Sequence, residues 1–129
     1  MSPTAITKGI KVSVESLYQP QHSQPQLNTF VFAYKITIEN YNACNLQLTY
    51  RYWTIKDAYG MERKIEGEGV VGKQPLIAPM GMYQYISACQ LSTEIGKMWG
   101  HYTIKNPETQ ETFSAEIPLF SLIAPFKMN

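Results

Sequence analysis

Cysteine is scarce in this sequence, and the two cysteines present, Cys44 and Cys89, do not form a CxxC pair. A small domain stapled by disulfides needs several cysteines, and a structural zinc site needs cysteines and histidines at short, regular spacings. Neither pattern is present, because the chain has only two histidines in addition. We therefore expect free thiols, with Cys44 near the tip of one loop and Cys89 buried and unreactive in another loop.

Long apolar runs and an excess of charge of one sign are also absent. No apolar stretch reaches the length of about 18 residues that suggests a membrane span, and the N-terminal segment lacks the apolar centre of a signal peptide. Eleven basic and ten acidic residues give a net charge of +1, and the basic residues are scattered along the chain. This argues against nucleic acid and membranes as partners, and we expect a cytoplasmic protein.

Helical periodicity is missing as well, because no segment repeats apolar residues at a spacing of about 3.6 positions. Segment 28–40 instead has apolar residues at every second position, namely Phe30, Phe32, Tyr34, Ile36 and Ile38. Successive side chains of a strand point to opposite faces, so this segment predicts a strand with one buried face. Similar patterns predict strands over residues 10–18, 46–57, 62–66, 82–88, 97–105 and 112–117.

These strands together predict the fold class. Turn residues recur along the chain at intervals of about 10 to 15 residues, which is typical of antiparallel sheets. A chain of 129 residues with 44% hydrophobic content is long enough for one domain with a proper core. We predict an all-β antiparallel β-sandwich of the immunoglobulin or fibronectin-type-III kind, with about seven or eight strands. A closed barrel is the alternative. The single domain spans residues 1–129, with its core over 10–122.

The strand expected over 46–57 contains a change of phase. Its apolar residues are Leu46 and Leu48 at even positions, then Trp53 and Ile55 at odd positions. A strict period of two cannot bury both pairs, so we predict a β-bulge near residues 50–52. The alternative is a strand with both faces partly covered, in which Arg51 lies under an aromatic neighbour.

Several stretches, in order along the chain, make the sequence similar to the ApaG family. They are FVFAYKITIEN (30–40), RYWTIKD (51–57) with Gly60 behind it, GEGVVGKQP (67–75), IAPMG (77–81) before Tyr85, GKMWGHY (96–102) and IPLFSL (117–122). The resemblance covers residues 10–122, nearly the whole domain. One departure is Tyr52, which stands where we would expect a histidine, so any chemistry of that histidine does not transfer to this chain.

The resemblance implies a small fibronectin-type-III-like β-sandwich, found alone in bacteria and as a module of some eukaryotic F-box proteins. It also implies a loose association with cobalt resistance and magnesium efflux. A pyrophosphate or nucleotide ligand at the glycine-rich run is a further implication of the resemblance.

The glycine-rich run is the first candidate site, because its glycines match the GxGxxG spacing of dinucleotide-binding proteins. That use requires a preceding parallel strand and a following helix, and Pro75 argues against such a helix. A tight turn, a bulge or a closely packed loop is the simpler interpretation. A modified phosphate site stays open, since glycine-loop amides can surround an anion. Its residues would be Gly67, Gly69, Gly72, Arg63, Lys64 and Lys73.

Metal-binding and catalytic patterns are weak. The only candidate metal ligands are Asp57, Glu62, Glu66 and Glu68, for which a solvated charged face is the simpler interpretation. No GxSxG motif occurs, and the two histidines, His22 in a loop and His101 in a strand, lie far apart in the sequence. We expect no enzyme, no cofactor and no metal site.

Aromatic residues exceed what one small core needs, since the chain has nine tyrosines and two tryptophans. We expect Tyr41, Tyr50, Tyr52 and Tyr59 to be exposed. We predict a binding module that recognises a protein or peptide through an exposed face or edge. A homodimer could pair through an open sheet edge or through the apolar tail at 122–126. The alternative function is pyrophosphate or nucleotide binding at residues 67–73.

Overall fold

The structure is a computed structural model in which residues 2–125 are described. Over these residues the chain forms nine β-strands and two short 3₁₀ helices. The strands are β1 (Thr4–Thr7), β2 (Ile10–Tyr18), β3 (Phe30–Asn40), β4 (Leu46–Asp57), β5 (Glu62–Glu68), β6 (Leu76–Ile77), β7 (Met82–Leu91), β8 (Ile95–Lys105) and β9 (Thr112–Ile123). The helices η1 (Pro20–His22) and η2 (Pro25–Leu27) connect β2 to β3. No helix within residues 2–125 is long and apolar enough to cross a membrane.

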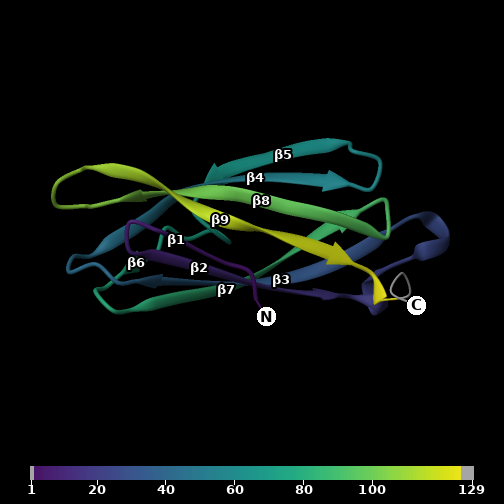
Figure 1. The fold of residues 1–129 in the computed structure, drawn as a ribbon, viewed down its shortest axis with the longest axis horizontal. Helices are drawn as coiled ribbons and strands as arrows, with labels where there is room; N and C mark the ends of the chain where they lie inside the picture. The colour runs from purple at the N-terminus through teal and green to yellow at the C-terminus, as the bar shows by residue number, and fades with distance from the viewer. Residues whose placement is uncertain (1, 126–129) are drawn as a thin grey trace.

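The strands form two antiparallel sheets that pack face to face. The first sheet has the order β1-β2-β3-β7, and the second has the order β5-β4-β8-β9 with β6 also paired to β4. In Figure 1, β5, β4 and β8 run through the upper part of the molecule and β2, β3 and β7 through the lower part, while β9 crosses from the upper left toward the lower right. This arrangement confirms the predicted antiparallel β-sandwich. Nine strands form in place of seven or eight because β1 and β6 add to the predicted set.

Strand β3 lies inside the first sheet, between β2 and β7. Its inward side chains are all buried, namely Phe30, Phe32, Tyr34, Ile36 and Ile38. The ring of Tyr34 packs against the second sheet, with its centroid 5.4 Å from that of Trp53 and 5.9 Å from that of Phe120. Burying one large apolar side chain contributes about 1.5 to 3 kcal/mol. This face of β3 therefore supplies a large share of the favourable free energy of folding.

A β-bulge in β4 shifts the alternation of that strand, so that apolar residues before and after it face the core. Leu48 pairs with Ile104 of β8 and Tyr50 pairs with Thr103, so Thr49 is the extra residue. The apolar residues on both sides of the bulge are buried, namely Leu46, Leu48, Trp53 and Ile55. The predicted bulge is confirmed, one residue before the predicted range, and the alternative without a bulge is wrong.

The bulge also decides which other side chains of β4 face the interior. Arg51 shares the inner face with Trp53, while Tyr50 and Tyr52 lie on the outer face of the second sheet. An arginine thus points between the sheets, and two tyrosines point away from them.

Strand β7 extends past the predicted strand 82–88, so the loop in which Cys89 was expected is wrong. Ser87, Cys89 and Leu91 continue the inward side of β7, and the last two are buried. Serine and glutamine in this segment obscured the alternation, because an edge strand tolerates polar residues on both faces. Cys89 therefore belongs to a strand and not to a loop.

Strand β9 also continues past its predicted end. A shift in its register against β8 leaves two residues, beginning with Pro118, opposite the single residue Trp99. Proline is accepted at such a bulge because its missing N–H is not needed there. Leu122 and Ala124 after it are buried, so these two residues of the tail predicted to pair two copies belong to the core, whereas Ile123 is exposed. Phe126 of that tail lies outside the described residues.

Two strands, β1 and β6, were not predicted from the sequence. Strand β1 pairs with β2 through a turn at Lys8 and Gly9, both with positive φ. Its side chains are only half-buried or exposed, including Ile6, so its alternation gave little signal. Strand β6 has two residues and pairs with the start of β4, which is too short for any periodic pattern.

Three interior tyrosines, Tyr34, Tyr85 and Tyr102, have a raised pKa, chiefly because burial disfavours the phenolate. The hydroxyls of Tyr85 and Tyr102 share a hydrogen bond. The charge of Arg51 opposes part of the rise in each pKa. A phenol whose pKa is higher in the folded state stabilises the fold below its unfolded pKa, and that stability is lost as the pH rises further.

We therefore expect the free energy of unfolding to fall above a pH of about 10. In a titration followed by phenolate absorbance, exposed tyrosines should ionise first. Tyr34, Tyr85 and Tyr102 should ionise only as the circular dichroism of the sheets is lost. Reversible ionisation of all nine tyrosines in a folded protein would contradict this expectation.

Candidate functional site

The glycine-rich run forms a two-residue hairpin turn after β5. Val70 and Lys73 exchange backbone hydrogen bonds of 2.7 and 3.0 Å, and Val71 and Gly72 between them both have positive φ. Two such central residues are what a type I′ turn requires. Gly69 also has positive φ, and a Cβ there would lie 2.1 Å from the Lys73 carbonyl oxygen. The second and third glycines of the motif therefore serve the conformation of this glycine turn (residues 69–73).

Gly67 lies in β5 and not in the loop where the sequence pattern placed it. It pairs with Arg51, and a Cβ on Gly67 would lie 3.1 Å from both Nη atoms of that arginine. The Arg51 Nη1 donates hydrogen bonds to the carbonyls of Glu68 at 3.1 Å and Gly69 at 3.0 Å. The first glycine of the motif thus gives an arginine room to lie against the strand.

The structural context of a dinucleotide site is absent from residues 2–125. Strand β5 pairs antiparallel with β4, and the glycine turn leads to β6 and not to a helix. The cations expected at this loop do not gather there. Arg63 is exposed at the open edge of β5 and reaches the Gln90 carbonyl of β7. Lys64 points to the other face, because neighbouring residues of a strand point in opposite directions. Both lie near the start of β5, whereas Lys73 follows the turn beyond its end.

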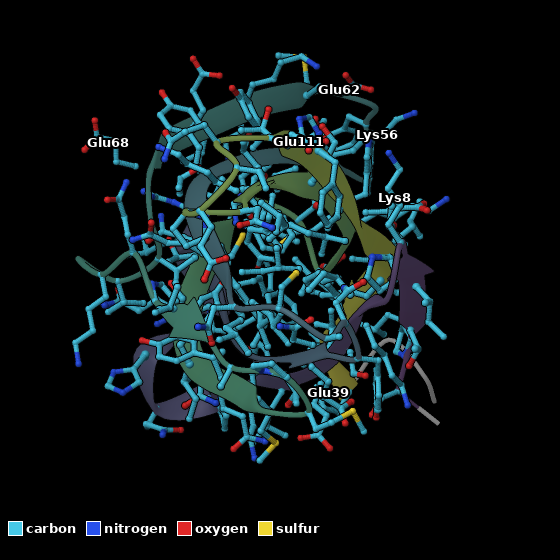
Figure 2. The ribbon with its side chains drawn as sticks, turned by 90° about the vertical axis from the view of Figure 1, so that its left-hand side faces the viewer. Lys8, Glu39, Lys56, Glu62, Glu68 and Glu111 are labelled. Carbon is cyan, nitrogen blue, oxygen red and sulfur yellow. The ribbon has the colours of Figure 1, made fainter. Side chains whose placement is uncertain are left out.

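The four carboxylates considered as metal ligands do not converge either. The Asp57 Oδ1 accepts hydrogen bonds from two backbone amides of the turn between β4 and β5. Glu62 and Glu68, at the two ends of β5, point into solvent at separate places on the surface (Figure 2). Glu66 is exposed between them. Within residues 2–125, no three His, Cys, Asp or Glu side chains form a group that could hold a metal ion.

The histidines and the buried cysteine have separate surroundings. His22 is exposed in η1, and His101 of β8 stacks on Tyr52 with ring centroids 4.4 Å apart. Burial raises the pKa of the Cys89 thiol, although Arg63, with its Nη2 3.6 Å from the sulfur, opposes the shift. Both cysteines are free, and a buried protonated thiol is a poor nucleophile.

Four half-buried rings lie together on the outer face of the second sheet. They are Tyr50, Tyr52, Trp99 and His101, here called the outer aromatic row. Tyr52 lies between Tyr50, with ring centroids 5.0 Å apart, and His101, whose ring is inclined to it by only 22°. The two tyrosines were predicted to be exposed, but Trp99 and His101 were not predicted to be their neighbours. The alternation in 97–105 places these two on one face, but only the pairing with β4 brings them to the tyrosines.

Carboxylates flank the outer aromatic row. Cross-strand pairing places Glu66, Tyr52, His101 and Glu116 in one line across β5, β4, β8 and β9. A cavity of about 230 Å³ opens beside this line, with Trp99 and Lys64 also in its lining. The second sheet therefore presents aromatic rings between two acidic side chains.

Comparison with known proteins identifies the family. The sequence model of the ApaG domain matches residues 20–106. A Protein ApaG from Brucella abortus is 44% identical over 122 residues, which are 95% of this chain and 93% of the relative. The chain belongs to the ApaG family. The Protein ApaG of Mesorhizobium japonicum is 46% identical over 121 residues, 94% of this chain and 92% of the relative.

The ApaG fold agrees with a solved structure. A crystal structure of a protein from Bordetella pertussis is 36% identical to this chain and superposes with a TM-score of 0.86, covering 95% of this chain and 96% of that one. The resemblance drawn from the sequence motifs is thereby confirmed. The matched region of the ApaG domain includes the glycine turn and the outer aromatic row but not β1, β2 or β9.

The glycine turn of this ApaG domain contains a strained residue. Val71 has a φ of 48°, a conformation that β-branched residues rarely adopt. We expect V71N to raise the free energy of unfolding by about 1 kcal/mol, because asparagine before glycine is favoured in type I′ turns. G72A, at a φ of 76°, should lower it by a similar amount. Urea unfolding measures both, and a destabilised V71N would contradict this explanation of the turn.

Proposed function

We propose that this ApaG domain is a non-enzymatic binding module that recognises a protein or peptide through the outer aromatic row. The stacking of His101 on Tyr52, on the solvent side of the second sheet, is the observation that carries the proposal. These rings do not fill the core between the sheets, which other side chains occupy. Half-exposed aromatic rings gain much burial on binding, and tyrosine and tryptophan are enriched at protein interfaces.

The surroundings of the row favour a partner segment that carries arginine. A guanidinium stacks flat on aromatic rings and pairs with carboxylates through two parallel hydrogen bonds. Glu66 and Glu116 lie at the two ends of the line through Tyr52 and His101, and Glu68 lies beside Tyr50. Lys64 is the one cation in the lining of the neighbouring cavity. The face is therefore suited to a planar cation more than to an anion.

The non-enzymatic part of the proposal rests on the residues that catalysis would need. The sequence has no GxSxG motif, and the buried Cys89 has a raised pKa. We further propose that the module acts in the cytoplasm. Its association with cobalt and magnesium, implied by the family, would be indirect, because the candidate carboxylates lie apart.

Pyrophosphate or nucleotide binding at the glycine turn is the second candidate function. The observation in its favour is that the amides of Val71 and Gly72 donate to no acceptor within residues 2–125. Two free amides beside one lysine, Lys73, form a small anion site. We rank this function second because Arg63 and Lys64 do not reach the turn.

The proposed function predicts selective binding of arginine-containing peptides. We expect a short peptide with two arginines to change the fluorescence of Trp99 and the NMR signals of Tyr52 and His101. The matched peptide with glutamate in place of arginine should not. W99A and Y52A should weaken binding about tenfold or more, as truncation of an interface anchor does.

Y41A is the matched control, because Tyr41 is 49% exposed and hydrogen-bonds Glu39 on the first sheet. It should leave peptide binding unchanged. Equal binding of both peptides, or an equal loss in Y41A, would contradict the proposal. Thermal stabilisation by pyrophosphate with shifts confined to Val71 and Gly72, and no peptide binding, would favour the second candidate.

A further inference from the structure

The open edge between the sheets contains a polar cleft that is separate from the outer aromatic row. Strand β7 ends the first sheet and β5 ends the second. Arg63 of β5 bridges them, since its Nη2 donates to the Gln90 carbonyl of β7 and lies 3.6 Å from the Cys89 sulfur. A cavity of about 240 Å³ opens along this edge, and we call it the edge cleft.

Arg51 reaches the same edge cleft from β4. Its Nη1 is held by the carbonyls of Glu68 and Gly69, and Gly67 leaves space for the guanidinium. Its Nη2 and Nε donate no hydrogen bond within residues 2–125. The guanidinium is thus fixed by one nitrogen, while its other N–H groups are available to a ligand.

The first sheet adds hydroxyl groups to the cleft. Tyr34 and Ser87, neighbours across β3 and β7, both line it. The remaining walls are largely apolar, including Trp53, Ile65 and Met98. Apolar walls lower the local dielectric constant and so strengthen the interaction of a fixed cation with an anion.

No acidic residue lines the edge cleft. Among residues 2–125, no carboxylate lies within ion-pair distance of Arg51 or Arg63. Two guanidinium groups that face one cleft without a counter-charge repel each other, and an anion between them would relieve that repulsion.

We propose that the edge cleft binds a small tetrahedral dianion such as inorganic phosphate. Arg51 and Arg63 supply the charge and N–H donors, and Ser87 supplies a hydroxyl donor. The two positive charges match a dianion. The volume of about 240 Å³ lies below the range of about 300 to 1,000 Å³ typical of drug-sized sites, so the cleft suits a phosphate-sized ion and not a nucleotide.

The test is an NMR titration of the full chain with sodium phosphate, with sodium sulfate as a second dianion and sodium chloride at matched ionic strength. We expect phosphate at millimolar concentration to shift the backbone amides of residues 87–90 and the side-chain signals of Arg51 and Arg63. Sulfate should shift the same signals, and chloride should not. Phosphate shifts that are no larger than those with chloride would overturn the proposal.

Charge variants identify the residues responsible. R51Q and R63Q should each raise the phosphate dissociation constant about tenfold or more. K64Q is the matched control, since it removes the same charge from the other face of β5 and should leave the constant unchanged. An equal loss in K64Q would overturn the proposal. If R51Q does not fold, the proposal is tested by the phosphate dissociation constant of R63Q and by the phosphate-induced NMR shifts of the unmodified chain.

The titration also separates the edge cleft from the other sites. Phosphate shifts confined to Val71 and Gly72 would place the anion on the glycine turn and overturn the edge-cleft proposal. Trp99 projects from the opposite face of the second sheet to Arg51, so W99A should leave phosphate binding unchanged. Failure of phosphate binding is therefore distinguishable from failure of peptide binding.

Discussion

Side chains from alternate positions of β3 fill the space between the two sheets, and every other feature of the molecule depends on that packing. Tyr34 contacts Trp53 and Phe120 across the gap, which holds the second sheet at a defined distance from the first. Because the inner faces are committed to the core, recognition is left to the outer faces and the edges. The outer aromatic row and the edge cleft occupy these two kinds of place.

Two β-bulges determine which side chains of β4 and β9 face the core and which face the solvent. The extra residue Thr49 in β4 keeps apolar residues inside along the whole strand, and in doing so turns Arg51 inward and Tyr50 and Tyr52 outward. The bulge at Pro118 does the same for β9, where it lies opposite Trp99. A strict period of two would bury the wrong residues in each strand. The bulges thus position the candidate binding residues as a consequence of satisfying the core.

The glycine-rich run illustrates how one motif can arise from different physical needs. In a nucleotide-binding fold the three glycines serve a single phosphate-binding turn and the helix behind it. Here Gly67 makes room for an arginine within a strand, whereas Gly69 and Gly72 supply the positive φ of a hairpin turn. The spacing matches the fingerprint because a β-hairpin with an arginine lying against its strand also requires small residues at these positions. Motif spacing alone does not distinguish these needs.

Most strands and the bulge in β4 could be predicted from the sequence, because each depends on the order of apolar and polar residues along one strand. The sandwich followed from the recurrence of turns between these strands, and the family from the resemblance of several motifs in order. Tyr50 and Tyr52 of the outer aromatic row were also predicted to be available for binding. What the sequence left open was which strands become neighbours. His101 meets Tyr52 only through the register of β8 against β4, and Arg63 approaches Cys89 only because β5 and β7 form facing edges. These contacts join residues far apart in the chain, so tertiary packing decided them and local patterning could not.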